Sequence, residues 1–103
     1  MDKDQLFQPR LPERDVVIDG VGTVRVRGLS RHEAILVQAE TGVLAERKML
    51  HFGMVDPALS EAEVTTWQHA SPAGELEPVT LAIADLSGIG EGAAKAAYKS
   101  VER

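Results

Sequence analysis

The chain has 103 residues, of which 44% are hydrophobic and 26% are charged, and its formal net charge is −5. These values suit one globular domain with a modest core. Cysteine is absent, which excludes disulfide bonds, thiolate metal sites and cysteine nucleophiles. No apolar run could span a bilayer, and the first residues lack the core of a signal peptide, so we expect a cytoplasmic protein with no membrane partner.

The negative charge is concentrated in the second half of the sequence. Residues 1–52 contain equal numbers of acidic and basic side chains, so the whole net charge of −5 falls in residues 53–103. Lys and Arg are absent between Gly53 and Ala94. A phosphate-binding surface normally needs clustered Lys or Arg side chains, and we therefore expect no nucleic-acid partner.

Residues 1–13 are predicted to be a flexible arm, because Pro9 and Pro12 limit regular structure and no periodicity is present. The following residues, 14–28, are predicted to form a β-hairpin. Its first strand is rich in β-branched side chains, and Asp19–Gly22 supplies a turn with two glycines. A lone hairpin is marginal in water, so we expect it to lie on the helices or on another chain.

The second strand of the hairpin, Thr23–Arg27, alternates strictly along its last four residues between apolar and basic side chains. Val24 and Val26 therefore share one face, and Arg25 and Arg27 share the other. If this strand lies at the edge of a sheet, it could pair with another chain, although its arginines also guard against such pairing. We name these two valines and two arginines as candidate partner-binding residues.

Residues 30–103 are predicted to form a compact bundle of about five helices, which makes residues 14–103 a single α+β domain. The first two predicted helices cover residues 31–40 and 43–54. Gly42 either separates them or lies within one longer helix, and we favour a break.

Capping boxes at Ser30–Glu33 and Ser60–Glu63 mark two helix starts. The helix that follows the second box runs to about Ala70 and places Val64 and Trp67 one turn apart. Trp67 is the only tryptophan, and we interpret it as a core anchor beside Val64. The alternative is a hot spot for partner binding, so we add Trp67 to the candidate partner-binding residues.

Ser71-Pro72 predicts the start of the fourth helix, because it offers an N-cap followed by proline at the first helical position. Gly88 is predicted to end this helix, and a last helix should run from Glu91 to about Val101. The clearest apolar stripe of the chain lies on the fourth helix. It consists of Leu76, Val79, Ile83 and Leu86.

The turn Gly88-Ile89-Gly90 allows two interpretations. In helix-hairpin-helix modules, backbone amides at such a turn donate to a phosphate group, and Lys95, Lys99 and Arg103 would add a basic row. Glu91 opposes this interpretation, because it places a carboxylate beside those amides. We favour a structural turn between two packed helices, and a small nucleic-acid-binding module is the alternative function.

No group of residues predicts catalysis, a bound metal or another cofactor. The three histidines are far apart in the sequence, and Ser30, Ser60 and Ser71 each have a capping role. Glu61 and Glu63 are two residues apart, so their carboxylates point away from each other on a helix. We therefore expect that the protein is not an enzyme.

Several sequence blocks follow one another along most of the chain. They are Leu11–Val16, Gly22–Arg31, Glu46–Leu50, Met54–Pro57, Trp67-Gln68, Ser71–Val79 and Leu86–Lys95. In this order and combination, the blocks resemble the short tail assembly chaperones of long-tailed, siphovirus-type phages of actinobacteria and of related prophages.

This resemblance implies a non-enzymatic role in virion assembly. Chaperones of that family bind the tape measure protein, keep it soluble and help tail tube subunits to assemble around it. The implied partners are the tape measure protein and the major tail tube protein, with self-association as a further option. The implied location is the host cytoplasm and not the mature virion, and the resemblance implies no catalytic or cofactor residues.

Overall fold

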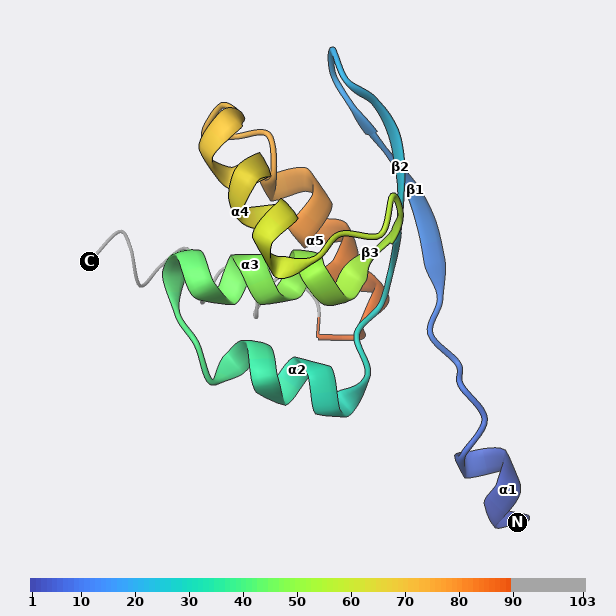
Figure 1. Ribbon diagram of the computed structural model, residues 1–103. Helices are drawn as coiled ribbons and strands as arrows, with labels where there is room; N and C mark the ends of the chain where they lie inside the picture. Colours follow the sequence, from blue (N-terminus) through green and yellow to red (C-terminus); the bar gives the residue numbers. More distant parts are fainter. Residues whose placement is uncertain (90–103) are drawn as a thin grey trace.

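The computed structural model describes residues 1–89, in which a three-stranded antiparallel sheet of order β1-β2-β3 packs against helices (Figure 1). This arrangement confirms the predicted α+β fold with an N-terminal hairpin. Within residues 1–89, no helix is long and apolar enough to cross a membrane. The last predicted helix, at residues 91–101, lies outside the described residues.

Strands β1 (Glu13–Ile18) and β2 (Gly22–Arg27) form the predicted hairpin, and each begins one residue earlier than expected. The two strands are paired along their full length. The amide of Val21 closes the turn by donating to the carbonyl of Ile18 at 3.0 Å. Gly20 has a φ of 77°, a left-handed conformation that glycine adopts without steric cost.

A third strand, β3 (Met54–Asp56), extends the sheet on the far side of β2. Met54 lies opposite Val26, and Asp56 lies opposite Arg25. The sequence predicted only the end of a helix here, because three residues are too few to show an alternating pattern. β2 is consequently the central strand, so the edge position that would have let it pair with another chain is not found.

The predicted arm is extended and carries one short helix, α1 (Lys3–Leu6), which the sequence did not predict. The side chain of Asp2 caps this helix by accepting a backbone hydrogen bond. Every residue from Met1 to Arg10 is exposed, and the arm leads away from the body of the protein beyond β1 (Figure 1). It joins the sheet at Pro12, whose carbonyl accepts from the amide of Gly28 at 2.9 Å.

Helices α2 (Arg31–Gln38) and α3 (Gly42–Gly53) are separate, which confirms the predicted break. Gly42 has a φ of 57° at the start of α3, a conformation that residues with a Cβ atom rarely adopt. The two helices contact each other, and α3 also contacts the helices that follow it. The glycine therefore redirects the chain between two packed helices.

Helices α2 and α4 (Glu61–Ala70) each begin with the predicted capping box. In α2, the hydroxyl of Ser30 accepts from the amide of Glu33 at 3.2 Å, and the Glu33 carboxylate accepts from the amide of Ser30 at 3.0 Å. Ser60 and Glu63 repeat the arrangement in α4. These reciprocal bonds satisfy amides that a helix start would otherwise leave without partners.

Helix α5 (Glu77–Leu86) begins later than predicted. Ser71-Pro72 does not start it; the carbonyl of Pro72 instead accepts from the amide of Glu75 at 3.1 Å in a turn. Pro78 lies in the first turn of α5, where its missing N–H leaves no helical hydrogen bond unmade. The proline that favours the observed start is therefore Pro78.

The end of α5 is held against the start of α2. Gly88 has a φ of 75° and ends the helix as predicted. The hydroxyl of Ser87 donates to a carbonyl one turn earlier in α5 at 2.6 Å and accepts from the amide of Leu29 at 2.7 Å. Gly28 comes so close that an added Cβ would lie 2.5 Å from the carbonyl oxygen of Leu86.

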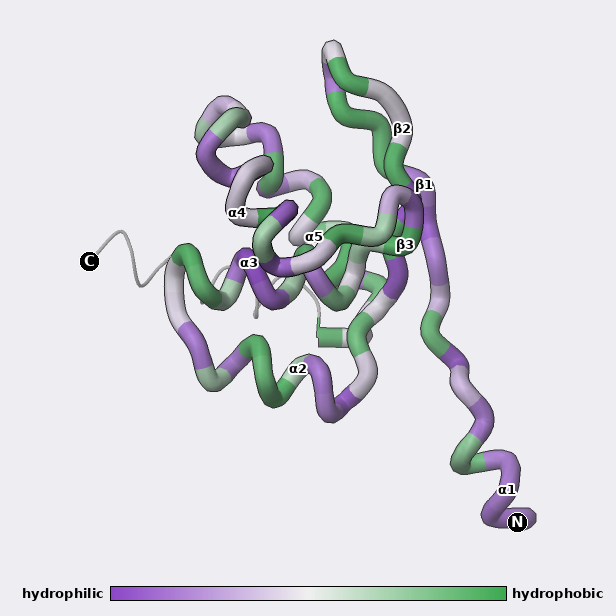
Figure 2. The backbone as a smooth tube through the Cα atoms, viewed as in Figure 1, coloured by the Kyte–Doolittle hydropathy of each residue, from purple (hydrophilic) through white to green (hydrophobic). Residues whose placement is uncertain are grey.

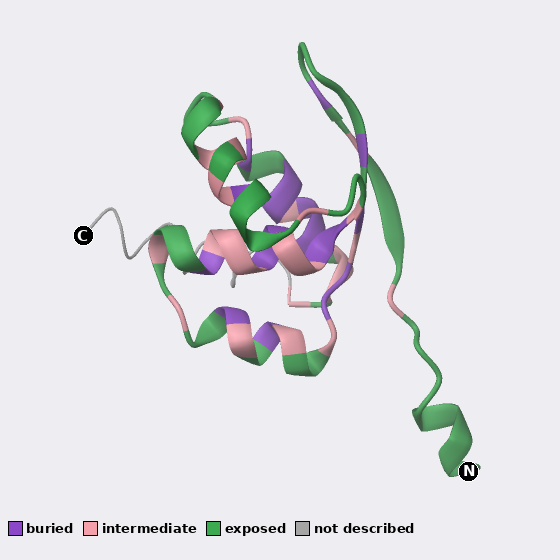
Figure 3. Cartoon of the chain, in the orientation of Figure 1, coloured by how far each residue is buried: buried purple, intermediate pink, exposed green. Residues whose placement is uncertain are grey.

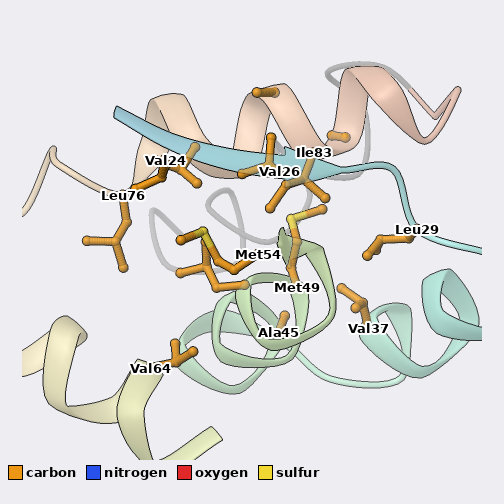
Figure 4. Packing of buried hydrophobic residues seen from close by; sticks show 14 of the residues in the cluster. Val24, Val26, Leu29, Val37, Ala45, Met49, Met54, Val64, Leu76 and Ile83 are labelled. Atoms are coloured by element: carbon orange, nitrogen blue, oxygen red, sulfur yellow. The ribbon is translucent and has the colours of Figure 1, made fainter. Parts of the chain in front are cut away.

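The hydrophobic core lies between the sheet and the helices (Figure 3). Helix α5 is central, because it contacts β1, β2 and α3. Its predicted apolar stripe is confirmed, with Leu86 half-buried and the other members buried. Figure 4 shows Val26 and Ile83 directed toward the methionines of α3 and β3. The residues without measurable exposure are Val26, Leu50, Val64, Val79, Ile83 and Ala84.

Candidate functional site

Two of the candidate partner-binding residues are part of the core. Val24 and Val26 of β2 are 8% and 0% exposed, and they share one face as the alternation predicted. Their side chains lie beside α5 in the cluster that holds the protein together (Figure 4). A partner could not reach these valines without opening the core.

Arg25 lies on the opposite face of β2 and is bound by two carboxylates of β1. Its Nε lies 2.6 Å from a carboxylate oxygen of Glu13, and its Nη1 lies 2.8 Å from a carboxylate oxygen of Asp15. The hydrogen bonds to Glu13 and then to Asp15 raise the pKa of the Arg25 guanidinium above its usual value. These ion pairs are exposed and offset one of the two negative charges on this part of the outer face.

Arg27, the last residue of β2, is bound to the start of α2. Its Nη1 and Nη2 each lie 2.8 Å from an oxygen of the Glu33 carboxylate, and Nη1 also donates to the carbonyl of Gly28 at 3.0 Å. The hydrogen bonds from Arg27 are the main reason that the pKa of the Glu33 carboxyl is lowered from its usual 4.5 to about 2. This arginine joins two elements of its own chain.

Trp67 packs against the core from α4 and is half-buried. Its indole Nε1 donates to a carboxylate oxygen of Glu75 at 2.8 Å, which links α4 to the turn before α5. Figure 1 shows α4 separated from β2 by α5. The structure therefore does not bring Trp67 together with the four candidate residues of β2.

Several large apolar side chains are exposed elsewhere, and sequence reasoning did not identify them. They lie on the arm, at the tip of the hairpin, and on a surface that we call the α2–α3 surface (Ile35, Val43 and Leu44). Figure 2 shows apolar segments at the hairpin tip and at the start of α3. The adjacency of Val43 and Leu44 is no signal of this exposure, because Met49 and Leu50 are also adjacent on α3 and both are buried.

No metal-binding cluster is found among the described residues. Within residues 1–89, no group of three or more His, Cys, Asp or Glu side chains is arranged to hold a metal ion. The Nδ1 atom of His51 lies 2.7 Å from the carbonyl oxygen of Leu59, and this contact holds the loop before α4.

The turn proposed for phosphate binding is described only in part. Gly88 has the left-handed conformation that a tight turn requires, and Ile89 packs against the core. Residues 90–103 lie outside the described residues, and these include Gly90, Glu91 and the basic row. The interpretation as a nucleic-acid-binding hairpin therefore stays a prediction.

Comparison of the chain with known protein families, with curated proteins and with solved structures finds no match.

Proposed function

We propose that this protein is a tail assembly chaperone of a long-tailed phage, which binds the tape measure protein and assists assembly of the tail tube without catalysing a reaction. The observation that carries the proposal is the ordered series of sequence blocks between Leu11 and Lys95 that resembles such chaperones. The proposal includes the host cytoplasm as its place of action and the major tail tube protein as a second partner.

The distribution of exposed apolar side chains supports a binding role. Ile35, Val43 and Leu44 are 48%, 61% and 49% exposed, and they lie on two helices that contact each other. Exposed apolar side chains on two neighbouring helices suit contact with the apolar stripe of a helical client. We therefore assign the tape measure protein to the α2–α3 surface.

Co-expression tests this proposal. The full chain should raise the soluble fraction of the tape measure protein encoded beside it and should co-purify with that protein. Leu44→Asp should abolish both effects, because it places a charge on the α2–α3 surface. Thr66→Asp is the matched control, since Thr66 is exposed on α4 and away from this surface.

Two results would oppose the proposal. One is an unchanged soluble fraction with no co-purification, and the other is a gene neighbourhood without a very long helical coding sequence. The nucleic-acid-binding alternative gains no support from the described residues, because no Lys or Arg occurs between Gly53 and Ile89. A mobility shift of DNA at low salt that is lost in Lys95→Glu would restore that alternative.

A further inference from the structure

The outer edge of the sheet is open along β1. Within residues 1–89, no strand pairs with this side of β1, which is first in the order β1-β2-β3. The amide of Gly28 donates to the carbonyl of Pro12 at 2.9 Å, which shows which residues of β1 direct their backbone groups toward β2. Even-numbered residues of β1 bond to β2, so the N–H and C=O groups of Glu13, Asp15 and Val17 point outward. Such an edge is a template for a further strand.

The charges that usually protect an edge strand are partly offset by ion pairs within the chain. Arg25 binds Glu13 at 2.6 Å and Asp15 at 2.8 Å, and Arg14 is bound by a carboxylate of α5 at 2.7 Å. The rest of β1, Val16–Ile18, carries no charge. These five charged side chains sum to one net negative charge, and an approaching strand meets no charge only along the apolar half of β1.

Exposed apolar side chains lie on the hairpin beside this open edge and on the arm that leads into β1. Val17 on the outer face of the hairpin and Val21 at its tip are 71% and 67% exposed. On the arm, Leu6 and Phe7 are 55% and 72% exposed. Large apolar side chains that are exposed in groups mark surfaces for association.

We propose that β1 pairs antiparallel with β1 of a second copy of this chain, so that the two sheets join across a two-fold axis. In such a pair, the segment that precedes β1 in one copy runs past the end of β1 in the other copy. The arm of each copy then reaches the hairpin tip of the other, and folding over this tip lets Leu6 and Phe7 cover Val17 and Val21. A single two-fold axis therefore buries the exposed apolar side chains of the arm and of the hairpin in both copies. A strand from an unrelated protein would leave the arm without a partner surface.

Charge and the length of the overlap select the register of this pair. Centring it on Asp15 would oppose two carboxylates on the two-fold axis, and centring it on Val17 would pair only residues 16–18 of each β1. Centring it on Val16 opposes Asp15 to Val17. This register pairs residues 14–18 of each β1 and places the acidic pairs, Glu13 with Asp19, at the ends of the overlap. Val16 should therefore face itself across the axis.

The arm is needed for a stable interface. Stable interfaces bury about 800 Å² on each partner, more than the edge of a six-residue strand offers. The arm adds a second contact region, which crosses the tip of the other hairpin. We therefore expect that loss of either the strand contact or the arm contact separates the two copies.

Sedimentation velocity on the full chain over a range of concentrations tests the proposal. The wild type should sediment as a dimer of the 11.1 kDa chain. Val17→Lys and removal of residues 1–10 should each raise the dissociation constant at least about tenfold. Val43→Lys is the matched control, since it changes a valine on α3 that is 61% exposed and should leave the dimer intact. Circular dichroism establishes that each variant is folded.

A cross-linking experiment tests the register directly. The chain contains no cysteine, so Val16→Cys introduces a single thiol. Under mild oxidation this variant should form an intermolecular disulfide, which gel electrophoresis under denaturing conditions detects as a dimer. Thr23→Cys lies one strand further from the axis and should run as a monomer. A monomeric wild type, or a dimer that survives both Val17→Lys and loss of the arm, would overturn the proposal. Neither outcome depends on the tape measure protein, so the two proposals fail separately.

Discussion

The guanidinium of Arg27 holds the carboxylate of Glu33 with two hydrogen bonds of 2.8 Å, one to each carboxylate oxygen. Glu33 also accepts from the amide of Ser30, so one carboxylate joins the end of β2 to the first turn of α2. The Arg27 and Glu33 side chains are 24% and 18% exposed, which screens this pair less than the exposed ion pairs of the hairpin.

Glu33→Gln should lower the free energy of unfolding by about 2 kcal/mol, because a neutral amide replaces a charged acceptor and turns one N–H₂ group toward Arg27. Urea unfolding measures this loss. Glu63→Gln is the matched control: it occupies the same position in the capping box of α4, where no arginine is bound to it in the structure. Its cost should be about 0.5 kcal/mol. Equal losses in the two variants would contradict the role assigned to Arg27.

The same carboxylate makes stability depend on pH. In the folded protein the pKa of Glu33 is lowered from 4.5 to about 2. A carboxyl with a lowered folded pKa adds stability that is fully present above its unfolded pKa and is lost as the pH falls toward its folded pKa. The difference in unfolding free energy between wild type and Glu33→Gln should therefore shrink from pH 4.5 to about pH 2. Urea titrations across this window measure it, and a constant difference would argue against the assignment.

Gly53 should not tolerate a larger side chain. A Cβ at this position would lie 2.5 Å from Cδ1 of Ile83 and 2.8 Å from its Cγ1, and Ile83 is fully buried. Gly53→Ala should therefore cost about 1 to 3 kcal/mol through overpacking. Gly74→Ala is the control, because no atom lies within 4 Å of its added Cβ. Thermal unfolding should show a lower melting temperature for the first variant alone.

The contact between Trp67 and Glu75 can be followed by fluorescence. Trp67 is the only tryptophan, so the emission spectrum reports one site. Glu75→Ala removes the acceptor of its indole N–H at 2.8 Å and should shift the emission maximum, with a loss of about 1 kcal/mol in unfolding free energy. Glu77→Ala, a nearby exposed change, should leave the spectrum unaltered. An identical spectrum in both variants would show that the indole does not depend on Glu75.

Local signals in the sequence predicted much of the fold. The capping boxes at Ser30 and Ser60 involve residues only three positions apart, and each begins a helix as expected. The glycines at 42 and 88 also act through local backbone conformation. Strand β3 was not predictable in this way, because it exists through pairing with β2 and not through a pattern of its own.

The candidate site was less predictable because its contacts are made between distant segments. Arg25 and Glu13 are 12 residues apart in the sequence, and Arg14 and Asp85 are 71 residues apart. Alternation correctly separated the arginines from the valines, but it could not show which carboxylates would bind them. Val17 is exposed because it lies on the outer face of the hairpin, and the unbroken apolar run of residues 16–18 does not show which of its members that face would carry.

The hydroxyl of Ser87 has a consequence for local opening of the structure. It donates to the carbonyl of Ile83 at 2.6 Å and accepts from the amide of Leu29 at 2.7 Å, so fraying of the last turn of α5 would expose that amide to solvent. Amide hydrogen exchange at Leu29 therefore reports the order of a helix end that lies 58 residues away in the sequence. A ligand or partner that bound the end of α5 would slow exchange at the entrance to α2 without touching it.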